Sequence, residues 1–154
     1  MHTSLAYYAS PIGLIEIEAT EAGVTSLVFV ERRRRATGAG SMARAAVREL
    51  EEYFKEGRRV FDVPLVPGGT EFQLRVWREL ATIPFGRTVS YQDIARAIGS
   101  PSAVRAVGAA NGRNPISIMV PCHRVVGSDG RLTGYGGGLW RKEWLLRHEG
   151  AVLL

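Results

Sequence analysis

The first thirty residues alternate apolar and polar positions, which is the pattern of β-strands with one buried face. Ile15, Ile17 and Ala19 are apolar, whereas Glu16 and Glu18 between them are charged. Glycine and proline separate the alternating stretches, because both residues favour turns. We expect strands over residues 5–9, 15–19 and 24–30.

Residues 41–56 change to the spacing of a helix. Its apolar face is formed by Met42, Ala46, Leu50, Tyr53 and Phe54. Ser41 is the expected N-cap, because its hydroxyl can accept a backbone N–H, and Gly57 is the expected end of the helix. Residues 59–63 fit a further short strand. The next segment, residues 64–69, has two prolines and two glycines and marks a domain boundary.

We therefore expect an α/β domain at residues 1–65 and a mainly helical domain at residues 66–154. Three signals for the start of a helix follow the boundary: Thr70 with Gln73, Ser90 with Asp93, and Ser100 with Pro101. Gly99 lies between the last two helices, and a pair joined by such a tight turn has the spacing of a helix-turn-helix. The second helix of the pair carries Arg105. A last helix is expected at residues 139–148.

The charge of the chain is unevenly distributed. Lys and Arg number 20 and Asp and Glu 15, and residues 1–65 hold nine of each sign, so the whole excess lies in residues 66–154. A basic domain with paired helices suggests a polyanion such as nucleic acid, although many basic surfaces and most paired helices bind none. The arginine-rich residues 31–40 are more simply interpreted as a solvated, mobile loop.

Cysteine occurs once in the chain. One thiol forms neither an internal disulfide nor a multi-cysteine zinc site, so we expect a reducing, cytoplasmic location, no metal and no cofactor. No stretch has the roughly 18 apolar residues of a membrane span, and the N-terminus lacks the pattern of a secretory signal. We therefore expect no membrane partner.

The single thiol lies in an apolar run that Cys122, His123 and Arg124 interrupt. A lone cysteine is more often a small buried hydrophobic residue than a nucleophile. Polar neighbours change this balance, because an imidazole or a cation lowers the pKa of a thiol and supplies the reactive thiolate. His123 would reach the thiol through a water and needs a carboxylate to orient it, either Glu149 or Asp129.

The segment Val120–Val126, with Asn114-Pro115 and Arg105–Gly108, closely resembles the O6-alkylguanine-DNA alkyltransferases, or methylated-DNA-protein-cysteine methyltransferases. The matches cover nearly all of residues 70–150. The resemblance implies a C-terminal domain with a winged-helix-like helix-turn-helix and a ribonuclease-H-like N-terminal α/β domain without catalytic residues. The N-terminal part matches only in the order of its strands and helix. The single cysteine departs from relatives that carry an N-terminal zinc site or zinc domain.

The resemblance assigns the chemistry to five residues. Cys122 would be the alkyl acceptor, and His123 with Glu149 would form a water-linked relay that removes its proton. Tyr91 would donate a hydrogen bond to the flipped guanine and help the leaving O6 take up charge. Asn114 would hold the turn between the recognition helix and the active-site segment.

The resemblance also implies a DNA surface and a substrate pocket. The DNA-binding residues would be Ser90, Arg105, Ala106 and Asn111. Arg105 would fill the gap that the extruded nucleotide leaves, whereas Asn111 stands where relatives can have an apolar residue. The pocket would be formed by Tyr91, Pro121, Val125, Tyr135, Gly136 and Lys142. The six glycines of residues 127–138 indicate an irregular loop at this pocket.

The implied activity is repair of double-stranded DNA by a monomer that binds the minor groove and acts on a flipped, alkylated base. The thiolate would take the alkyl group from O6-alkylguanine, and from O4-alkylthymine, as a thioether. A thioether has no carbonyl for water to attack, and the chain has no second thiol, so each molecule would act once.

Two other functions stay open from the residues alone. A cysteine hydrolase would use Cys122 with a histidine base and an oxyanion hole, and would turn over many substrates. A non-catalytic helix-turn-helix protein that binds or senses damage would not use the thiol. Singly, Tyr91 and Tyr135 could be core aromatics, Arg105 a solvated charge and Asn114 a helix C-cap. Their joint occurrence at the family spacing favours the functional interpretation.

Overall fold

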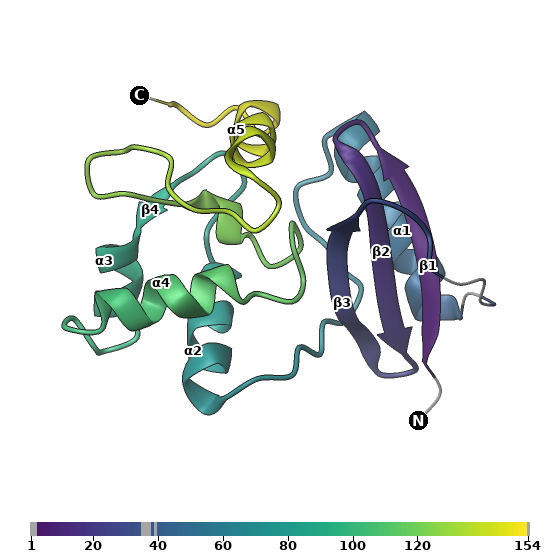
Figure 1. Ribbon diagram of the computed structural model, residues 1–154, viewed down its shortest axis with the longest axis horizontal. Coiled ribbons are helices and arrows are strands. Elements are labelled where there is room, and N and C mark those ends of the chain that lie inside the picture. Colours follow the sequence, from purple (N-terminus) through teal and green to yellow (C-terminus); the bar gives the residue numbers. More distant parts are fainter. Residues whose placement is uncertain (1–2, 35–37, 39, 154) are drawn as a thin grey trace. The chain divides into compact units, whose positions relative to one another are not determined.

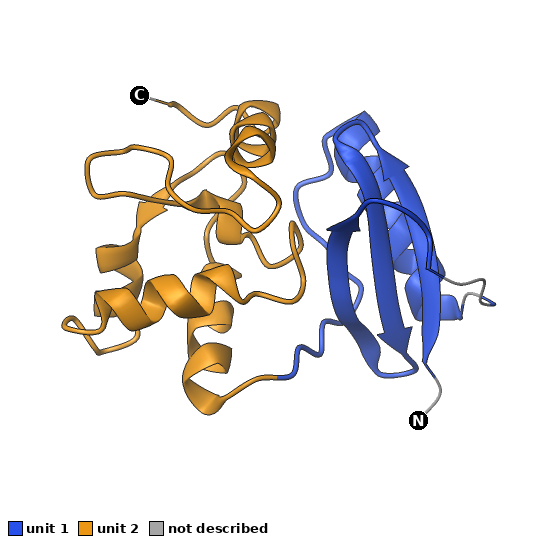
Figure 2. Cartoon of the chain, viewed as in Figure 1, with its two compact units in different colours: residues 1–68 blue, residues 69–154 orange. Residues whose placement is uncertain are grey.

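The computed structural model describes residues 3–34, 38 and 40–153. The chain divides into two compact units, residues 1–68 and 69–154, which Figure 2 shows in different colours. The first unit is a sheet with one helix, and the second is mainly helical (Figure 1), as the sequence predicts. Among the described residues, no helix is long and apolar enough to cross a membrane.

The first unit is built on an antiparallel sheet in the order β1-β2-β3. Its elements are β1 (Ser4–Ser10), β2 (Gly13–Thr20), β3 (Gly23–Val30) and the helix α1 (Ser41–Glu56), which packs on the sheet (Figure 1). Ile15, Ile17 and Ala19 are buried, which confirms the apolar positions of the predicted alternation. Leu50 and Tyr53 on the apolar side of α1 are fully buried as well, so the core of the unit lies between helix and sheet.

Glu16 departs from the alternation, because its side chain is buried although it lies on the face of β2 that should be polar. Arg34 donates to its carboxylate from Nε at 2.8 Å and from Nη2 at 2.6 Å, and Tyr7 donates at 2.7 Å. Arg34 therefore covers a buried charge, which the interpretation of residues 31–40 as a solvated loop missed. Residues 35–37 and 39 of that stretch lie outside the described residues.

The sequence predicted one end of α1 correctly and the other wrongly. Gly57 ends the helix with a left-handed φ of 71°. Ser41 is the first helical residue and not the cap, because the extended residue before the helix is Gly40, which has no side chain to accept an N–H. The strand expected at residues 59–63 is also wrong. That segment is irregular, and Leu65 beyond it pairs with β3 in an isolated parallel bridge.

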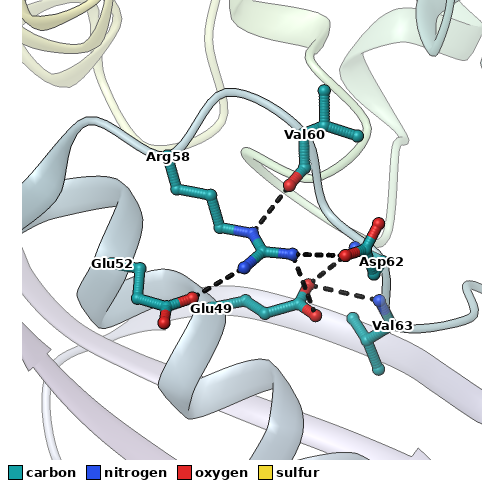
Figure 3. A network of polar contacts seen from close by, with 6 residues as sticks. All are labelled: Glu49, Glu52, Arg58, Val60, Asp62 and Val63. Carbon is teal, nitrogen blue, oxygen red and sulfur yellow. Dashed lines mark hydrogen bonds and ion pairs between the residues drawn. The ribbon is translucent and has the colours of Figure 1, made fainter.

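A network of polar contacts holds this irregular segment (Figure 3). The buried Glu49 of α1 accepts the backbone N–H groups of Asp62 and Val63 at 3.0 and 3.2 Å. Arg58 lies beside it, with ion-pair distances of 2.7 Å to Glu52 and 2.8 Å to Asp62. A carboxylate of α1 thus supplies the acceptors that a neighbouring strand would provide in a sheet.

The second unit consists of short elements joined by long irregular segments. They are α2 (Glu71–Leu80), β4 (Val89–Ser90), α3 (Tyr91–Ala97), α4 (Val104–Gly112), the 3-10 turn η1 (Cys122–Arg124), β5 (Val125–Val126) and α5 (Leu139–His148). Both capping boxes are present, which confirms the starts of α2 and α3. β4 and β5 pair in parallel, and both α2 and α3 pack on α4.

The expected helix-turn-helix consists of α3 and α4, but α4 starts later than predicted. Gly99 has a left-handed φ of 78°. The N–H of Ala103 then donates to the carbonyl of Ser100 at 2.9 Å, so residues 100–103 form a turn and α4 begins after it. Pro101 suits the second position of a β-turn as well as the first position of a helix, which explains the error.

We expect Glu49→Ala to lower the free energy of unfolding by about 2 kcal/mol, because it leaves the N–H groups of Asp62 and Val63 without their acceptor. Glu52→Ala is the matched control. Glu52 also contacts Arg58 but is partly exposed, so its loss is expected to cost less than about 1 kcal/mol. Urea unfolding of the full chain measures both values. Equal costs would show that Glu49 acts only as a partner of Arg58.

Candidate active site

Cys122 is the first residue of η1, at the end of an irregular segment that follows α4. It is buried, with 6% of its surface exposed. The backbone ahead of it is strained, because Ile118 has a φ of 71°, which is unfavourable for a β-branched residue. The N–H of Cys122 donates to the Val120 carbonyl at 2.8 Å, and the N–H of Arg124 to the Pro121 carbonyl at 3.0 Å. The thiol therefore belongs to a closely hydrogen-bonded turn.

Two asparagines connect the end of α4 to this turn. Asn114 donates to the carbonyls of Val120 and Ile116 at 2.8 and 3.3 Å, and its Oδ1 accepts the Ile116 N–H at 3.0 Å. Asn111 donates to the carbonyl of Cys122 itself at 3.4 Å. Side chains at the end of α4 thus bind the backbone on both sides of the thiol.

Asn111, predicted from the resemblance to contact DNA, is buried in the structure. It is buried on the same face of α4 as Val107 and Ala110, because residues three and four apart share one face of a helix. Its contact with the Cys122 carbonyl is the one the structure describes, and a DNA contact by Asn111 stays a prediction. Arg105 and Ala106, in contrast, are exposed on α4.

Three ionisable side chains form a buried cluster. His123 and Arg124 directly follow Cys122 in the sequence, and Glu149 comes from the end of α5. Nε2 of His123 lies 2.8 Å from Oε2 of Glu149. Arg124 binds both oxygens of this carboxylate, from Nε at 2.8 Å and Nη2 at 3.0 Å, and donates from Nη1 to the Ile83 carbonyl at 2.7 Å. Asp129 is exposed on the glycine-rich loop. Of the two candidate carboxylates, Glu149 is therefore the one that contacts the imidazole.

Burial and Arg124 determine the charges in this cluster. Burial alone would raise the pKa of Glu149, but the hydrogen bonds and charges of His123 and Arg124 lower it to about 2, so the carboxylate is ionised. Burial lowers the pKa of His123; contact with Glu149 opposes this effect, and Arg124 and Lys142 add to it. The imidazole is therefore neutral at pH 7. When Nε2 donates to Glu149, Nδ1 is an acceptor, and this buried atom has no hydrogen-bond partner among the described residues.

The thiol is neutral as well, contrary to the expectation that its neighbours lower its pKa. Burial raises the pKa of Cys122, and the hydrogen bond with Asn114 and the charge of Lys142 offset only part of the rise. The effect of desolvation on the pKa is larger than the combined effect of the Asn114 amide and the Lys142 ammonium group. Cys122 therefore needs a base to become a nucleophile, and the neutral imidazole of His123 can act as one.

The glycine-rich loop, residues 127–138, is attached to both α5 and α3. Lys142 of α5 is buried and donates from Nζ to the carbonyls of Thr133 and Gly134 at 2.6 and 3.4 Å. Burial lowers the pKa of Lys142 to about 8. On the other side, Oγ1 of Thr133 donates to the hydroxyl of Tyr91 at 3.0 Å. The loop thus lies between two residues that the sequence predicts at the pocket.

The remaining predicted residues divide between the interior and the surface. Pro121 and Val125 are buried on either side of η1. Tyr135 is half-buried, and burial raises the pKa of its hydroxyl well above the usual range. Gly136 is exposed. Ser90 is the N-cap of α3, where its hydroxyl accepts a backbone N–H at 3.0 Å.

Two residues of the site were not recognised from the sequence as part of it. Arg124 was noted only as a cation near the thiol and not as the partner of Glu149. A charged residue in a largely apolar run is the signal that could have indicated a buried partner for Arg124, whereas Glu149 lies among other charged residues and gave no such signal. Thr133 gave no signal, because a threonine in a polar, glycine-rich loop is unremarkable until the fold brings it to Tyr91.

Family models match both units of the chain. Residues 4–67 match the model described as 6-O-methylguanine DNA methyltransferase, ribonuclease-like domain, and residues 71–151 match the model described as its DNA binding domain. The chain is 47% identical over 152 residues to the methylated-DNA–protein-cysteine methyltransferase of Methanosarcina acetivorans. It is 50% identical over 153 residues to that of Mycolicibacterium paratuberculosis. These alignments cover 95% and 94% of this chain and 97% and 93% of the relatives.

Solved structures from Mycobacterium tuberculosis are similar over both units. Its O6-methylguanine methyltransferase has a TM-score of 0.87 and 45% identity, with 97% of this chain and 93% of that chain covered. The structure of Mycobacterium tuberculosis OGT in complex with DNA has a TM-score of 0.85 and 48% identity, with 94% and 92% covered. The similarity therefore includes the segment that carries Cys122.

We expect Arg124→Gln to raise the pKa of His123, because the Glu149 carboxylate would then favour the imidazolium without an opposing guanidinium. Arg124→Lys keeps a positive charge and is the matched control, with a smaller rise expected. NMR titration of the His123 ring in the full-length variants measures both shifts. If the pKa of His123 in Arg124→Gln stays at its original value, burial alone keeps the imidazole neutral.

Proposed function

This chain belongs to the 6-O-methylguanine DNA methyltransferase family and repairs DNA by transferring an alkyl group to a cysteine of its own; we propose that Cys122 is the acceptor and that His123, oriented by Glu149, removes its proton. One observation carries the assignment of roles. The only cysteine of the chain is buried and neutral, and the next residue is a neutral imidazole whose Nδ1 has no hydrogen-bond partner in the described part of the chain.

The first step of the proposed mechanism is transfer of the thiol proton. Adjacent side chains seldom face each other, so we place one water between Sγ of Cys122 and Nδ1 of His123. The imidazole becomes positive as it takes the proton, and the ionised Glu149 beside Nε2 stabilises that charge. Arg124 keeps Glu149 ionised, and the charge of Lys142 favours the thiolate.

The second step is a displacement at carbon. Sγ attacks the alkyl carbon on O6 of guanine, the carbon–oxygen bond breaks, and O6 keeps the electron pair. Tyr91 donates a hydrogen bond to the base, which favours this charge, and the base then takes up a proton to become guanine. The product thioether is stable to water and the chain has no second thiol, so each molecule reacts once.

We propose that α4 enters the minor groove, with Arg105 and Ala106 towards the duplex and Ser90 of α3 nearby. The positive excess of residues 66–154 attracts the phosphates. An alkylated base lies inside the stack, so its nucleotide must rotate out, and Arg105 fills the gap. The flipped base then enters a pocket formed by Tyr91, Pro121, Val125, Tyr135, Gly136 and Lys142.

Five finer assignments belong to the same proposal. The first unit is ribonuclease-H-like, in line with the family model that it matches, and the second is winged-helix-like. The protein acts as a monomer on DNA in the cytoplasm. O4-alkylthymine is a second substrate, because the same displacement at carbon applies to it. The assignments of fold, oligomeric state and location are independent of the role of Cys122, whereas the second substrate depends on it.

The direct test is to incubate the full chain with a duplex that carries one O6-methylguanine and to measure its intact mass. We expect a gain of one methylene-equivalent per molecule, located on Cys122 by peptide mapping. Product formed many times without a gain in mass would indicate a cysteine hydrolase. Binding without any reaction would indicate a non-catalytic DNA-binding protein.

We expect Cys122→Ser to abolish alkyl transfer and to leave duplex affinity largely unchanged, because a neutral hydroxyl is a much weaker nucleophile of almost the same size. Intact mass measures the transfer, and fluorescence anisotropy with a labelled duplex measures the affinity. Transfer retained by the serine variant would remove Cys122 from the mechanism.

We expect Arg105→Ala to slow repair of duplex DNA much more than reaction with free O6-benzylguanine, because only the duplex requires a base to be extruded. Arg113→Ala is a control with a matched loss of charge outside α4, and we expect a small effect on both reactions. Single-turnover rates with each substrate measure the ratio. Equal losses on both substrates would place Arg105 in the chemistry.

A further inference from the structure

Thr133 lies where the glycine-rich loop meets the start of α3. Its Oγ1 donates to the hydroxyl of Tyr91 at 3.0 Å, across 42 positions of sequence. Its methyl group faces Gly127, because a Cβ added at Gly127 would lie 3.7 Å from Cγ2. A β-branched side chain has few rotamers, so the place of the methyl group also determines the direction of the hydroxyl.

The backbone of Thr133 is held independently of this contact. Nζ of Lys142 donates to the Thr133 carbonyl at 2.6 Å, and the neighbouring Gly134 carbonyl lies 3.4 Å from the same atom. Arg141 donates to the Gly137 carbonyl at 2.8 Å. The second half of the loop is thereby attached to α5, and Thr133 presents its hydroxyl to Tyr91 from a fixed position.

Tyr91 is also placed by its surroundings. It is the first residue of α3, directly after the capping box of Ser90 and Asp93. Its ring lies near α4, because a Cβ added at Gly108 would be 3.9 Å from the ring carbon Cδ1. The ring thus starts from α3 and lies near α4, whereas the position of the hydroxyl hydrogen depends on what the oxygen contacts.

We propose that Thr133 is a positioning residue that aims the hydroxyl hydrogen of Tyr91 at the alkylated base. This inference rests on the role proposed above for Tyr91 as a hydrogen-bond donor. A phenol has one hydrogen to donate and lone pairs that accept. With the Thr133 hydroxyl donating to the Tyr91 oxygen, the single hydrogen of Tyr91 is left for the base.

The two hydrogen bonds strengthen each other. A hydroxyl that accepts a hydrogen bond is a better donor, because the chain of donors polarises in one direction. Charge that develops on guanine as the carbon–oxygen bond breaks would therefore be stabilised by Tyr91 and, through it, by Thr133. The contribution grows as the reaction proceeds, so its loss lowers the rate constant of transfer more than the affinity for the base.

The contact has little value as a structural bond. Thr133 is exposed and Tyr91 is half-buried, so water can replace either partner when the other is absent. Lys142 holds the Thr133 backbone whatever its side chain is. A variant without the hydroxyl should therefore keep its loop and its melting temperature, which separates positioning from folding.

The test compares Thr133→Val, which replaces the hydroxyl by a methyl group of similar size, with Thr133→Ser, which keeps the hydroxyl. We expect Thr133→Val to lower the limiting rate constant of alkyl transfer by about three- to tenfold with both free O6-benzylguanine and a duplex substrate. Duplex affinity and melting temperature should not change. Thr133→Ser should restore most of the rate.

A double-mutant cycle with Tyr91→Phe identifies the route of the effect. Once Tyr91 has no hydroxyl, Thr133 has nothing to aim, so Thr133→Val in the Tyr91→Phe background should cause no further loss. A full additional loss in that background would overturn the inference, as would a single Thr133→Val variant that reacts at the original rate. If Tyr91→Phe itself reacts at the original rate, the proposed role of Tyr91 fails. A slow Tyr91→Phe beside a fast Thr133→Val removes only the role of Thr133.

Discussion

The carboxylate of Glu149 carries a negative charge inside the second unit, at the C-terminal end of α5, where the helix dipole already disfavours it. A lone buried charge costs several kcal/mol, and only paired and hydrogen-bonded partners offset that cost. Arg124 supplies the pairing and also binds the Ile83 carbonyl after α2, so three distant segments are connected through one ion pair. The carboxylate also contacts His123. Folding of the unit and orientation of the imidazole of His123 thus both depend on the Glu149 carboxylate.

The helix that we propose to enter the DNA groove is part of the same arrangement. α4 presents Arg105 on its exposed face, and its end holds the turn around Cys122 through Asn111 and Asn114. Trp77 of α2 donates to the Ala110 carbonyl on the buried face of α4. A group attached to Sγ therefore adds volume beside the backbone that these amides hold. Because packed interiors yield little, the hydrogen bonds of the two asparagines would pass such a strain to α4, the proposed DNA-binding helix.

The sequence predicts what is encoded over a few residues and misses what the fold brings together. The capping box at Ser90 and the left-handed end at Gly57 follow from local chemistry, and the thiol motif follows from residues adjacent in the chain. Burial of Glu16 and Asn111 could not be predicted, because each depends on partners elsewhere in the sequence. The prediction that the pKa of Cys122 is lowered failed for the same reason. The charged and polar neighbours of the thiol are visible in the sequence, whereas its desolvation, which raises the pKa, is a property of the packed interior.

Burial that raises the pKa of Cys122 is compatible with its proposed use as a nucleophile. The intrinsic nucleophilicity of a thiolate rises with the pKa of its thiol, so a desolvated sulfur attacks carbon more readily once it has lost its proton. Only a small fraction of the thiol is ionised at rest, so the relay must remove its proton. His123 can accept this proton because burial and Arg124 keep the imidazole neutral. A neutral resting thiol also reacts slowly with other electrophiles. Each molecule has one cysteine to alkylate and no second thiol to restore it. A thiol that becomes reactive only when His123 removes its proton therefore keeps this one reaction for the alkylated nucleotide.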